Sequence, residues 1–336
     1  MLTVVVGGQY GSEAKGAVTG FLARNSAAPV VVRVGGPNAG HTVYDDEGRE
    51  WKLRQVPVGF VNPDADLVLA AGSVVDRNVL AEEVDQLEKA GHKVKGRLFI
   101  DKEATVLSPQ DVDNEEQLGL NSRIGSTSKG VGAARAARIW RQADRFVDVD
   151  RASSADTLGG IRAALREHRH VIVEGTQGYG LGLHAGFYPF CTSSDVRAVD
   201  FLSQVGLSPW EHNVGQFTVW VVFRTRPIRV AGNSGYLFGE TTWSALGLPD
   251  EYTTVTKRVR RVGEWDPELA LAALEANGHP SPCTRVAVTM LDQLFPEVAG
   301  RTQLSPRAIQ WLTERAEELG HPIDLVGTGP TTLTPT

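Results

Sequence analysis

Short apolar segments recur along the chain and are separated by stretches with helical periodicity. Most of these segments are continuous rather than alternating, which is typical of strands buried on both faces of a parallel sheet. They occupy residues 2–6, 29–34, 67–71, 170–173, 217–223, 285–288 and 323–326. We therefore expect an α/β fold in which helices flank a mainly parallel central sheet.

Three of the intervening segments carry helix signals at their ends. Residues 306–319 repeat apolar residues on one face, with Ser305 as a candidate N-cap and Gly320 as the stop. Residues 77–90 and 266–277 also end at a glycine. The pattern predicts a helix over each of these segments.

Residues 43–56 predict a β-hairpin whose tip is the acidic cluster at residues 45–48. The chain contains no internal repeat, low-complexity tract or Pro/Ser-rich linker. With 336 residues it is long enough to bury the core of one large α/β domain. We therefore expect residues 1–336 to form a single elaborated domain.

Composition and charge narrow the functional classes. The net charge of -6 and a pI near 5.8 give no overall attraction to nucleic acid or to an anionic membrane. Cys191 and Cys283 lack the spacing of a disulfide framework or a zinc site. No apolar run is long enough to cross a bilayer, and the first strand begins at Leu2 without a signal segment. We expect a cytoplasmic protein with no nucleic-acid or membrane partner.

The glycine-rich turn after the first strand, VVVGGQYGSEAKG, is the first candidate site. Gly7, Gly8 and Gly11 permit backbone geometries that let N–H groups converge on an anion at the start of a helix. Lys15 adds a positive charge for the outer phosphates of a nucleotide. The order departs from the usual G-K-[ST] ending, because Lys15 precedes Gly16. We predict a P-loop-like phosphate site, with an ordinary strand-to-helix turn as the alternative.

A second glycine-rich segment, GGPNAGHT at residues 35–42, also follows an apolar strand. Open α/β sheets bind ligands at the carboxyl ends of their strands. A lone histidine is usually structural. Framed by Asn38, Gly40 and Thr42 at this sheet edge, His41 becomes a candidate acid or hydrogen-bond donor to a reacting oxygen.

Three more segments combine glycine with polar side chains. Residues 124–132, IGSTSKGVG, predict a second anion site, with a solvated loop as the alternative. Residues 174–194 place Gln177 and Thr192 after a buried strand. Residues 256–263, TKRVRRVG, carry arginines that could clamp carboxylates or phosphates, with a basic surface loop as the alternative. A further arginine row is typical of a solvated helix face: Arg135, Arg138 and Arg141.

Taken in order, these segments resemble the adenylosuccinate synthetase family. The matching motifs cover nearly the whole chain: GGQYGSEAKG, GGPNAGHT, IGSTSKGVG, EGTQG, YPFCTSS, TKRVRRVG, TMLDQ and PIDLVGTGP. The resemblance implies a dimeric ligase that uses a nucleoside triphosphate and Mg²⁺ to phosphorylate O6 of a purine monophosphate. The amine of L-aspartate then displaces that phosphate at C6.

The resemblance also assigns roles to individual residues. Ser12, Lys15 and His41 would form the catalytic group, and Ser12 with the Gly40 carbonyl would hold Mg²⁺. The triphosphate site would comprise Gly11, Ser12, Glu13, Ala14, Lys15, Gly16, Gly40, His41, Thr42, Asp292, Gly327 and Gly329. The purine monophosphate site would comprise Ser12, Asn38, Thr127, Gln177, Thr192, Arg258 and, from across a dimer interface, Arg141. The aspartate site would comprise Thr256, Arg258 and Arg260.

Ser12 is the main departure from the family, whose phosphate loop reads G-D-E-G-K-G. The family's aspartate ligates Mg²⁺ and removes the proton from N1 of hypoxanthine, whereas serine is a poor base and a weaker metal ligand. Guanine carries a 2-amino group beside N1, and serine both makes room for it and accepts its hydrogen bond. Water or the phosphates would then take the N1 proton.

This substitution makes the chain similar to the viral branch of the family, N6-succino-2-amino-2'-deoxyadenylate synthase. That branch joins L-aspartate to dGMP to make the precursor of 2-aminoadenine in bacteriophage DNA. The preference for deoxyribose rests on the resemblance alone. Two alternatives stay open: an ordinary adenylosuccinate synthetase that acts on IMP, and a non-catalytic nucleotide-binding descendant.

The motifs that would read the donor base also depart from the family. The family's K-L-D is Met290-Leu291-Asp292, and its S-T-G-P is Gly327-Thr328-Gly329-Pro330. Asp292 could accept from guanine or from the amine of adenine, so the lost contacts loosen selectivity for GTP. We expect ATP or dATP as the donor, with GTP as the alternative.

Overall fold

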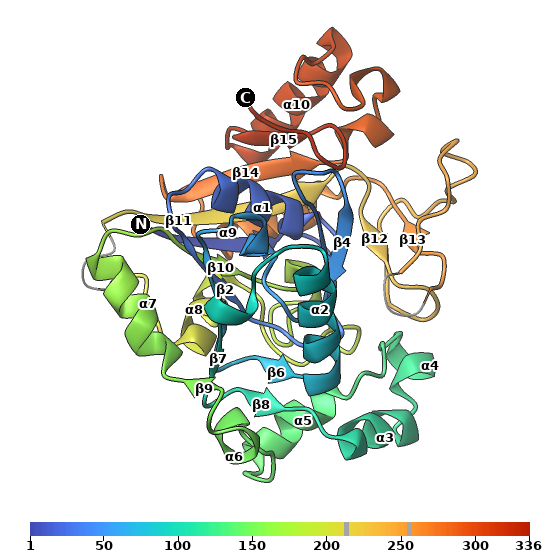
Figure 1. Ribbon diagram of the computed structural model, residues 1–336. Coiled ribbons are helices and arrows are strands. Elements are labelled where there is room, and N and C mark those ends of the chain that lie inside the picture. The colour runs from blue at the N-terminus through green and yellow to red at the C-terminus, as the bar shows by residue number, and fades with distance from the viewer. Residues whose placement is uncertain (212–214, 254–256) are drawn as a thin grey trace.

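The computed structural model of the protein describes residues 1–211, 215–253 and 257–336. Its centre is a ten-stranded sheet with the order β16-β15-β14-β11-β1-β10-β2-β5-β7-β9 (Figure 1). Neighbouring strands in this sheet run parallel, except that β16 is antiparallel to β15. The expected α/β fold with a mainly parallel central sheet is confirmed.

The seven predicted strands are present, each within two residues of the predicted ends. Three described strands of the central sheet were not predicted: β7 is partly exposed, β9 has two residues, and β16 is a short antiparallel edge. The strands of the central sheet are β1 (Leu2–Gly7), β2 (Val30–Arg33), β5 (Asp66–Leu69), β7 (Leu98–Asp101), β9 (Ser154–Ala155), β10 (Val171–Glu174), β11 (Phe217–Arg224), β14 (Thr284–Thr289), β15 (Leu325–Gly327) and β16 (Leu333–Pro335).

Helices fill the connections, and the three predicted ones are α2, α9 and α10. Helix α10 begins as expected, because Ser305 Oγ accepts the N–H of Ala308, and it ends at Gly320, whose φ of 57° is left-handed. The helices are α1 (Lys15–Arg24), α2 (Arg77–Lys89), α3 (Pro109–Gln117), α4 (Leu120–Ile124), α5 (Val131–Ile139), α6 (Phe146–Val149), α7 (Thr157–Arg166), α8 (Ala198–Val205), α9 (Pro267–Glu275) and α10 (Pro306–Leu319).

In the part of the chain that the structure describes, three two-stranded sheets accompany the central one. The predicted hairpin is β3 (His41–Tyr44) with β4 (Glu50–Leu53), and Asp45 Oδ1 closes its tip by accepting the N–H groups of Glu47 and Arg49. The other two pairs are β6 (Val74–Val75) with β8 (Thr105–Val106), and β12 (Ile228–Arg229) with β13 (Arg261–Val262).

The sheet is buried on both faces, which explains the continuous apolar strands. Leu2, Val4 and Val6 of β1 pack in one cluster together with residues of α7, α8, α9 and α10. Val5 packs in the opposite cluster with residues of α1, α2 and the β3–β4 hairpin. Each fully buried Val or Leu contributes about 1.5–3 kcal/mol, so this core fixes the strand ends that carry the polar loops.

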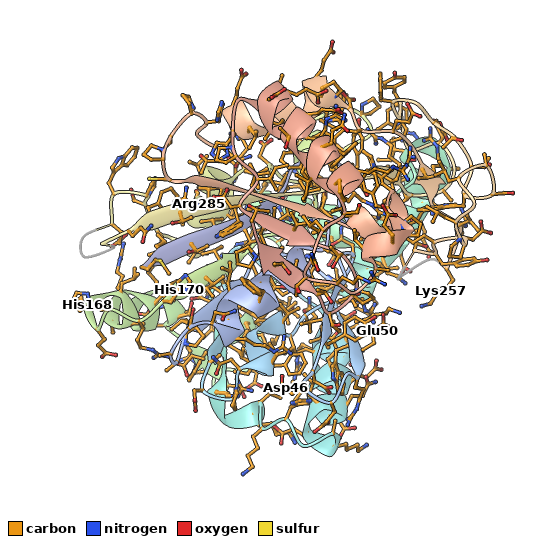
Figure 2. The ribbon with its side chains drawn as sticks, turned by 90° about the horizontal axis from the view of Figure 1, so that it is seen from above. Asp46, Glu50, His168, His170, Lys257 and Arg285 are labelled. Carbon is orange, nitrogen blue, oxygen red and sulfur yellow. The ribbon has the colours of Figure 1, made fainter. Side chains whose placement is uncertain are left out.

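From β1 the chain adds β2, β5, β7 and β9 on one side of the sheet. After β10, which lies between β1 and β2, it crosses to the other side of β1 and adds β11 and β14, so the direction of strand addition reverses around β1. Open α/β sheets bind ligands outside the carboxyl ends of strands at such a point. His168 and His170 lie beside the amino ends of the strands, whereas Lys257 lies on the opposite side (Figure 2). The polar motifs predicted from the sequence therefore meet at the carboxyl edge.

Candidate functional site

A cavity of about 410 Å³ lies at this carboxyl edge. Its size is in the range of small-molecule binding sites. Loops that follow β1, β2 and β10 line it, together with the turn before α5, strand β12 and residues just before β13. It brings together eleven of the residues predicted from the sequence: Gly11, Ser12, Lys15, Asn38, Gly40, His41, Thr127, Gln177, Thr192, Arg258 and Arg260.

The remaining predicted residues lie elsewhere. Arg141 is exposed just beyond the end of α5. Thr256 lies outside the described residues. Seven others do not line the cavity. They lie in the phosphate loop and the first turn of α1, in β3, or at and after the ends of β14 and β15: Glu13, Ala14, Gly16, Thr42, Asp292, Gly327 and Gly329. Their predicted contacts with a triphosphate stay predictions.

Glu13 holds the phosphate loop together from inside. Its buried carboxylate accepts the N–H groups of Gln9 at 3.1 Å and Gly11 at 2.7 Å through Oε1, and Oε2 pairs with Lys15 Nζ at 2.6 Å. Gly178 packs so closely that a Cβ there would lie 2.3 Å from Glu13 Oε1, which explains this glycine. The carboxylate of Glu13 therefore faces the loop and holds Lys15 in place.

Helix α1 begins directly after this loop without a side-chain cap. Its N-cap, Ala14, has a φ of 63°, and Ser12 is also left-handed with a φ of 58°. The N–H groups of a first helical turn have no partner within the helix, and the helix dipole favours an anion beside them. This geometry suits the anion site that the glycine pattern predicts, and the binding of a phosphate there stays a prediction.

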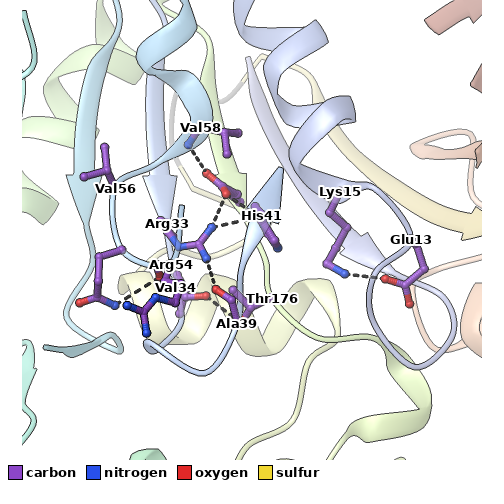
Figure 3. A network of polar contacts seen from close by, with 12 residues as sticks. Glu13, Lys15, Arg33, Val34, Ala39, His41, Arg54, Val56, Val58 and Thr176 are labelled. Atoms are coloured by element: carbon purple, nitrogen blue, oxygen red, sulfur yellow. Dashed lines mark hydrogen bonds and ion pairs between the residues drawn. The ribbon is translucent and has the colours of Figure 1, made fainter. Parts of the chain in front are cut away.

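His41 is positioned by two buried charged residues, Glu174 and Arg33 (Figure 3). Glu174 Oε1 lies 2.5 Å from His41 Nδ1 and also pairs with Arg33. Glu174 Oε2 accepts the N–H of Val58 at 3.0 Å, and Arg33 Nη2 donates to the carbonyl of Ala39 at 2.7 Å. Residues of β2 and β10 therefore hold the imidazole ring of His41, the first residue of β3, in place.

This arrangement decides which nitrogen of His41 is available. Arg33 Nη1 lies 2.9 Å from Nδ1, but Glu174 Oε1 is closer and an ionised carboxylate only accepts, so we assign the hydrogen to Nδ1. Nε2 has no partner among the described residues. Burial and Arg33 lower the pKa of His41 to about 4, against the opposing effect of Glu174. The neutral ring presents a lone pair at Nε2, and donation from Nε2 needs a second proton, which the charge of a bound polyphosphate would favour.

The arginine segment is anchored by Glu251. Its carboxylate binds Arg224 with both oxygens, at 3.1 and 2.6 Å, and accepts from Arg260 Nη1 at 2.5 Å. Burial raises the pKa of Glu251, but Arg224 and Arg260 outweigh this and lower the pKa to about 2. Arg258 reaches Asn121 at 3.5 Å across the cavity mouth. The segment predicted as an arginine clamp is thus preorganised beside the phosphate loop.

The order and spacing of these segments match a known sequence profile. The profile of adenylosuccinate synthetase matches residues 4–158 and 151–299. The chain belongs to the adenylosuccinate synthetase family. The adenylosuccinate synthetase of Thermococcus sibiricus is 38% identical over 335 residues, covering 97% of this chain and 95% of that protein. That of Archaeoglobus fulgidus is 35% identical over 336 residues, covering 98% and 95%.

Solved structures of the family have the same fold. The succinoaminodeoxyadenylate synthetase (PurZ) of cyanophage S-2L, bound to dGMP and to dATP as an energy donor, superposes with a TM-score of 0.84 at 29% identity. It covers 100% of this chain and 95% of that chain. A fully ligated adenylosuccinate synthetase from Plasmodium falciparum superposes with a TM-score of 0.83 at 20% identity, covering 99% of each chain.

As a member of the adenylosuccinate synthetase family, the protein is a carbon–nitrogen ligase that uses aspartate and a purine nucleotide. Enzymes of this family depend on Mg²⁺ in general. Among the residues that the structure describes, no helix has the length and apolar character needed to span a bilayer.

Several site residues were missed in the sequence. Arg33 and Glu174 are charged residues in otherwise apolar strands, β2 and β10, and both are buried. A charge at the end of a buried strand is costly unless it is paired, so this position was the available signal. Arg224 carried the same signal, because it is a buried charge at the end of the apolar strand β11, whereas Glu251 lies outside any strand and carried none.

Proposed function

We propose that this ligase joins L-aspartate to C6 of dGMP with hydrolysis of ATP or dATP. The product is N6-succino-2-amino-2'-deoxyadenylate, formed through a 6-phosphoryl purine and used for the 2-aminoadenine DNA of a phage. The observation that carries the proposal is Ser12, which lines the cavity where the family has an aspartate. The cyanophage enzyme of the same fold, bound to dGMP and dATP, supports it.

The described residues are suited to this reaction. Ser12 leaves room for the 2-amino group of guanine and can accept a hydrogen bond from it. Lys15 and the start of α1 would neutralise the transferred phosphoryl group, and His41 Nε2 would contact the oxygen at C6. Arg258 and Arg260 would bind the carboxylates of aspartate. Phosphoryl transfer depends mainly on such positioning and charge neutralisation.

The donor set fits a magnesium ion that arrives with a nucleotide. Within the described residues, no group of three His, Cys, Asp or Glu side chains could hold a metal by itself. The Ser12 hydroxyl and the Gly40 carbonyl are hard oxygen donors on one cavity. Mg²⁺ commonly keeps waters and binds substrate phosphates with few protein ligands, and it would supply charge neutralisation between the phosphates.

We place the donor base beside Asp292, which follows β14. Asp292 is partly buried, and burial raises its pKa. Met290 replaces the lysine that would help to read guanine, so ATP or dATP is favoured and GTP is the alternative. The dATP bound to the cyanophage enzyme supports this choice.

A substrate comparison tests the proposal. The purified protein is incubated with Mg²⁺, L-aspartate and either ATP, dATP or GTP, and phosphate release is followed with dGMP, GMP and IMP. We expect dGMP to be consumed with ATP or dATP while IMP stays nearly untouched. Faster turnover of IMP than of dGMP would overturn the proposal.

An ordinary adenylosuccinate synthetase that acts on IMP is the second candidate. It is favoured by archaeal relatives that carry that name, such as the Thermococcus sibiricus enzyme at 38% identity. The non-catalytic alternative predicts binding of dGMP and ATP without product. The buried Arg33–Glu174–His41 group argues against it, because a chain under no catalytic selection would be expected to lose such a costly arrangement.

A further inference from the structure

One carboxylate, that of Glu251, is shared by two guanidinium groups that belong to different parts of the site. Its Oε1 accepts from Arg224 Nη1 at 3.1 Å and from Arg260 Nη1 at 2.5 Å, and Oε2 accepts from Arg224 Nη2 at 2.6 Å. The main chain adds a further link, because the N–H of Arg260 donates to the Glu251 carbonyl at 2.8 Å.

Arg224 connects this carboxylate to the phosphate loop. It lies at the end of β11, and its side chain is fully buried. The amide of Gln9 binds both its backbone N–H and its carbonyl at 3.0 Å, and Arg224 Nη1 donates to the carbonyl of Ser12 at 3.3 Å. Arg224 Nη2 also reaches Gln293 at 3.4 Å, one residue from Asp292. A displacement of Arg224 would therefore also shift the backbone of Ser12.

Arg260 connects the same carboxylate to the cavity. It lines the cavity, and its Nε is buried without a partner among the described residues. The cluster of Arg224, Arg260 and Glu251 carries two positive charges and one negative charge. An acidic ligand at Arg260 would supply the missing negative charge and would compete with Glu251 for this guanidinium.

We infer that Glu251 is a positioning residue that couples the binding of L-aspartate at Arg260 to the position of Ser12 against the purine nucleotide. The inference rests on the proposed role of Arg260 in binding aspartate. When a ligand carboxylate takes part of the charge of Arg260, Oε1 of Glu251 binds Arg224 more strongly. Arg224 then holds the Ser12 carbonyl, and the loop around the purine, more firmly.

Equilibrium binding measures this coupling without turnover. The Kd of dGMP is determined by calorimetry with and without saturating L-aspartate, in the absence of any triphosphate, so that no reaction occurs. We expect aspartate to lower the Kd of dGMP by about fivefold or more in the native enzyme. The ratio of the dGMP Kd without aspartate to the Kd with aspartate measures the coupling. In Glu251→Gln, which keeps the shape and removes the charge, this ratio should fall to about one.

Glu240→Gln is the matched control. Glu240 pairs with Arg261 of β13, is exposed, and does not line the cavity. This variant should keep the native ratio. A ratio near one in the native enzyme, or a native ratio in Glu251→Gln, would overturn the inference even if the affinity for aspartate fell.

Glu251→Asp keeps the test decisive if Glu251→Gln fails to fold. The shorter carboxylate keeps the charge but spans the two guanidinium groups poorly, so the ratio should again decrease, and an unchanged ratio overturns the inference. The titrations are repeated with IMP. Tighter binding and faster turnover of IMP would count against the proposed substrate, while the ratio would still report on Glu251.

Discussion

Three carboxylates, two of them fully buried and that of Glu251 partly exposed, position the groups that would meet the substrates. Glu13 holds Lys15, Glu174 holds His41, and Glu251 holds Arg260. Each accepts hydrogen bonds from at least one further group, which offsets the cost of removing the charge from water. Single substitutions at these residues should therefore affect both stability and activity.

Glu174→Gln should slow the reaction and destabilise the fold. The variant leaves Arg33 buried without its counter-charge, so unfolding free energy should fall by about 3–5 kcal/mol. It also loosens the orientation of His41, so kcat should fall by about 10-fold or more, approaching the roughly 100-fold loss expected for His41→Ala. Urea unfolding and steady-state kinetics measure the two effects.

Glu83→Gln is the control for Glu174→Gln. Glu83 is a buried carboxylate that accepts the N–H groups of residues 54–56, away from the cavity. Its loss should lower stability and leave kcat unchanged. An unchanged kcat in Glu174→Gln would reduce His41 and its partners to a structural cluster.

Ser12→Asp should reverse the base preference. The longer carboxylate would collide with the 2-amino group of guanine and restore a base for N1 of hypoxanthine. The ratio of kcat/KM for dGMP over IMP should fall by about 10-fold or more. Retention of the native ratio would contradict the steric explanation of Ser12.

Glu251 makes the fold sensitive to acid. A carboxyl whose pKa is lower in the folded chain contributes stability above its ordinary pKa of 4.5, and this contribution is lost as the pH falls toward about 2. The loss should amount to about 2 kcal/mol, allowing for partial exposure of the side chain. Urea unfolding between pH 7 and 2.5 should show that the unfolding free energy of Glu251→Gln depends less on pH than that of the native chain.

At the scale of single elements, the N-terminal end of helix α10 has the cap that its sequence predicts. Ser305 caps α10 through the N–H of Ala308 and also donates to Glu297. Ser305→Ala should lower the unfolding free energy by about 1 kcal/mol, while kcat and KM stay native because α10 lies away from the cavity. Thermal unfolding and kinetics check both parts, and an altered kcat would contradict the separation of α10 from the site.

The elements that could be predicted are those whose burial is set by their own sequence. β1 and β10 are buried on both faces, so continuous apolar runs revealed them. β9 and β16 have two and three residues, and their pairing depends on neighbours supplied by distant parts of the chain. Glycine and cap residues fixed α2 and α10 because these signals are local.

The site was predictable to the extent that its residues sit in loops after strands. Lys15, His41 and Gln177 were found because parallel strands bring such loops to one edge. The inward position of Glu13 could not be predicted, because it depends on how closely the loop packs against Gly178. The link between Glu251 and Arg224 depends on the tertiary path of the chain, which local patterns do not encode.

At the scale of the whole molecule, the expected dimer can be tested by mixing subunits. Arg141 is exposed, and the family resemblance predicts that it reaches the nucleotide phosphate of a second subunit. Arg141→Ala and His41→Ala dimers should each be nearly inactive. After mixing and reassociation at equal concentrations, half of the dimers are hybrids with one intact site, so activity should recover to about a quarter of the native value. No recovery would contradict the shared site.

The two edges of the central sheet are both short. β9 ends one side with two residues, and β16 ends the other with three, including Pro335, which has no N–H to offer. Long unpaired edges invite strands from other molecules and lead to fibrillar aggregates. The wide sheet of this enzyme thus offers few free backbone groups to a strand from another molecule at either end.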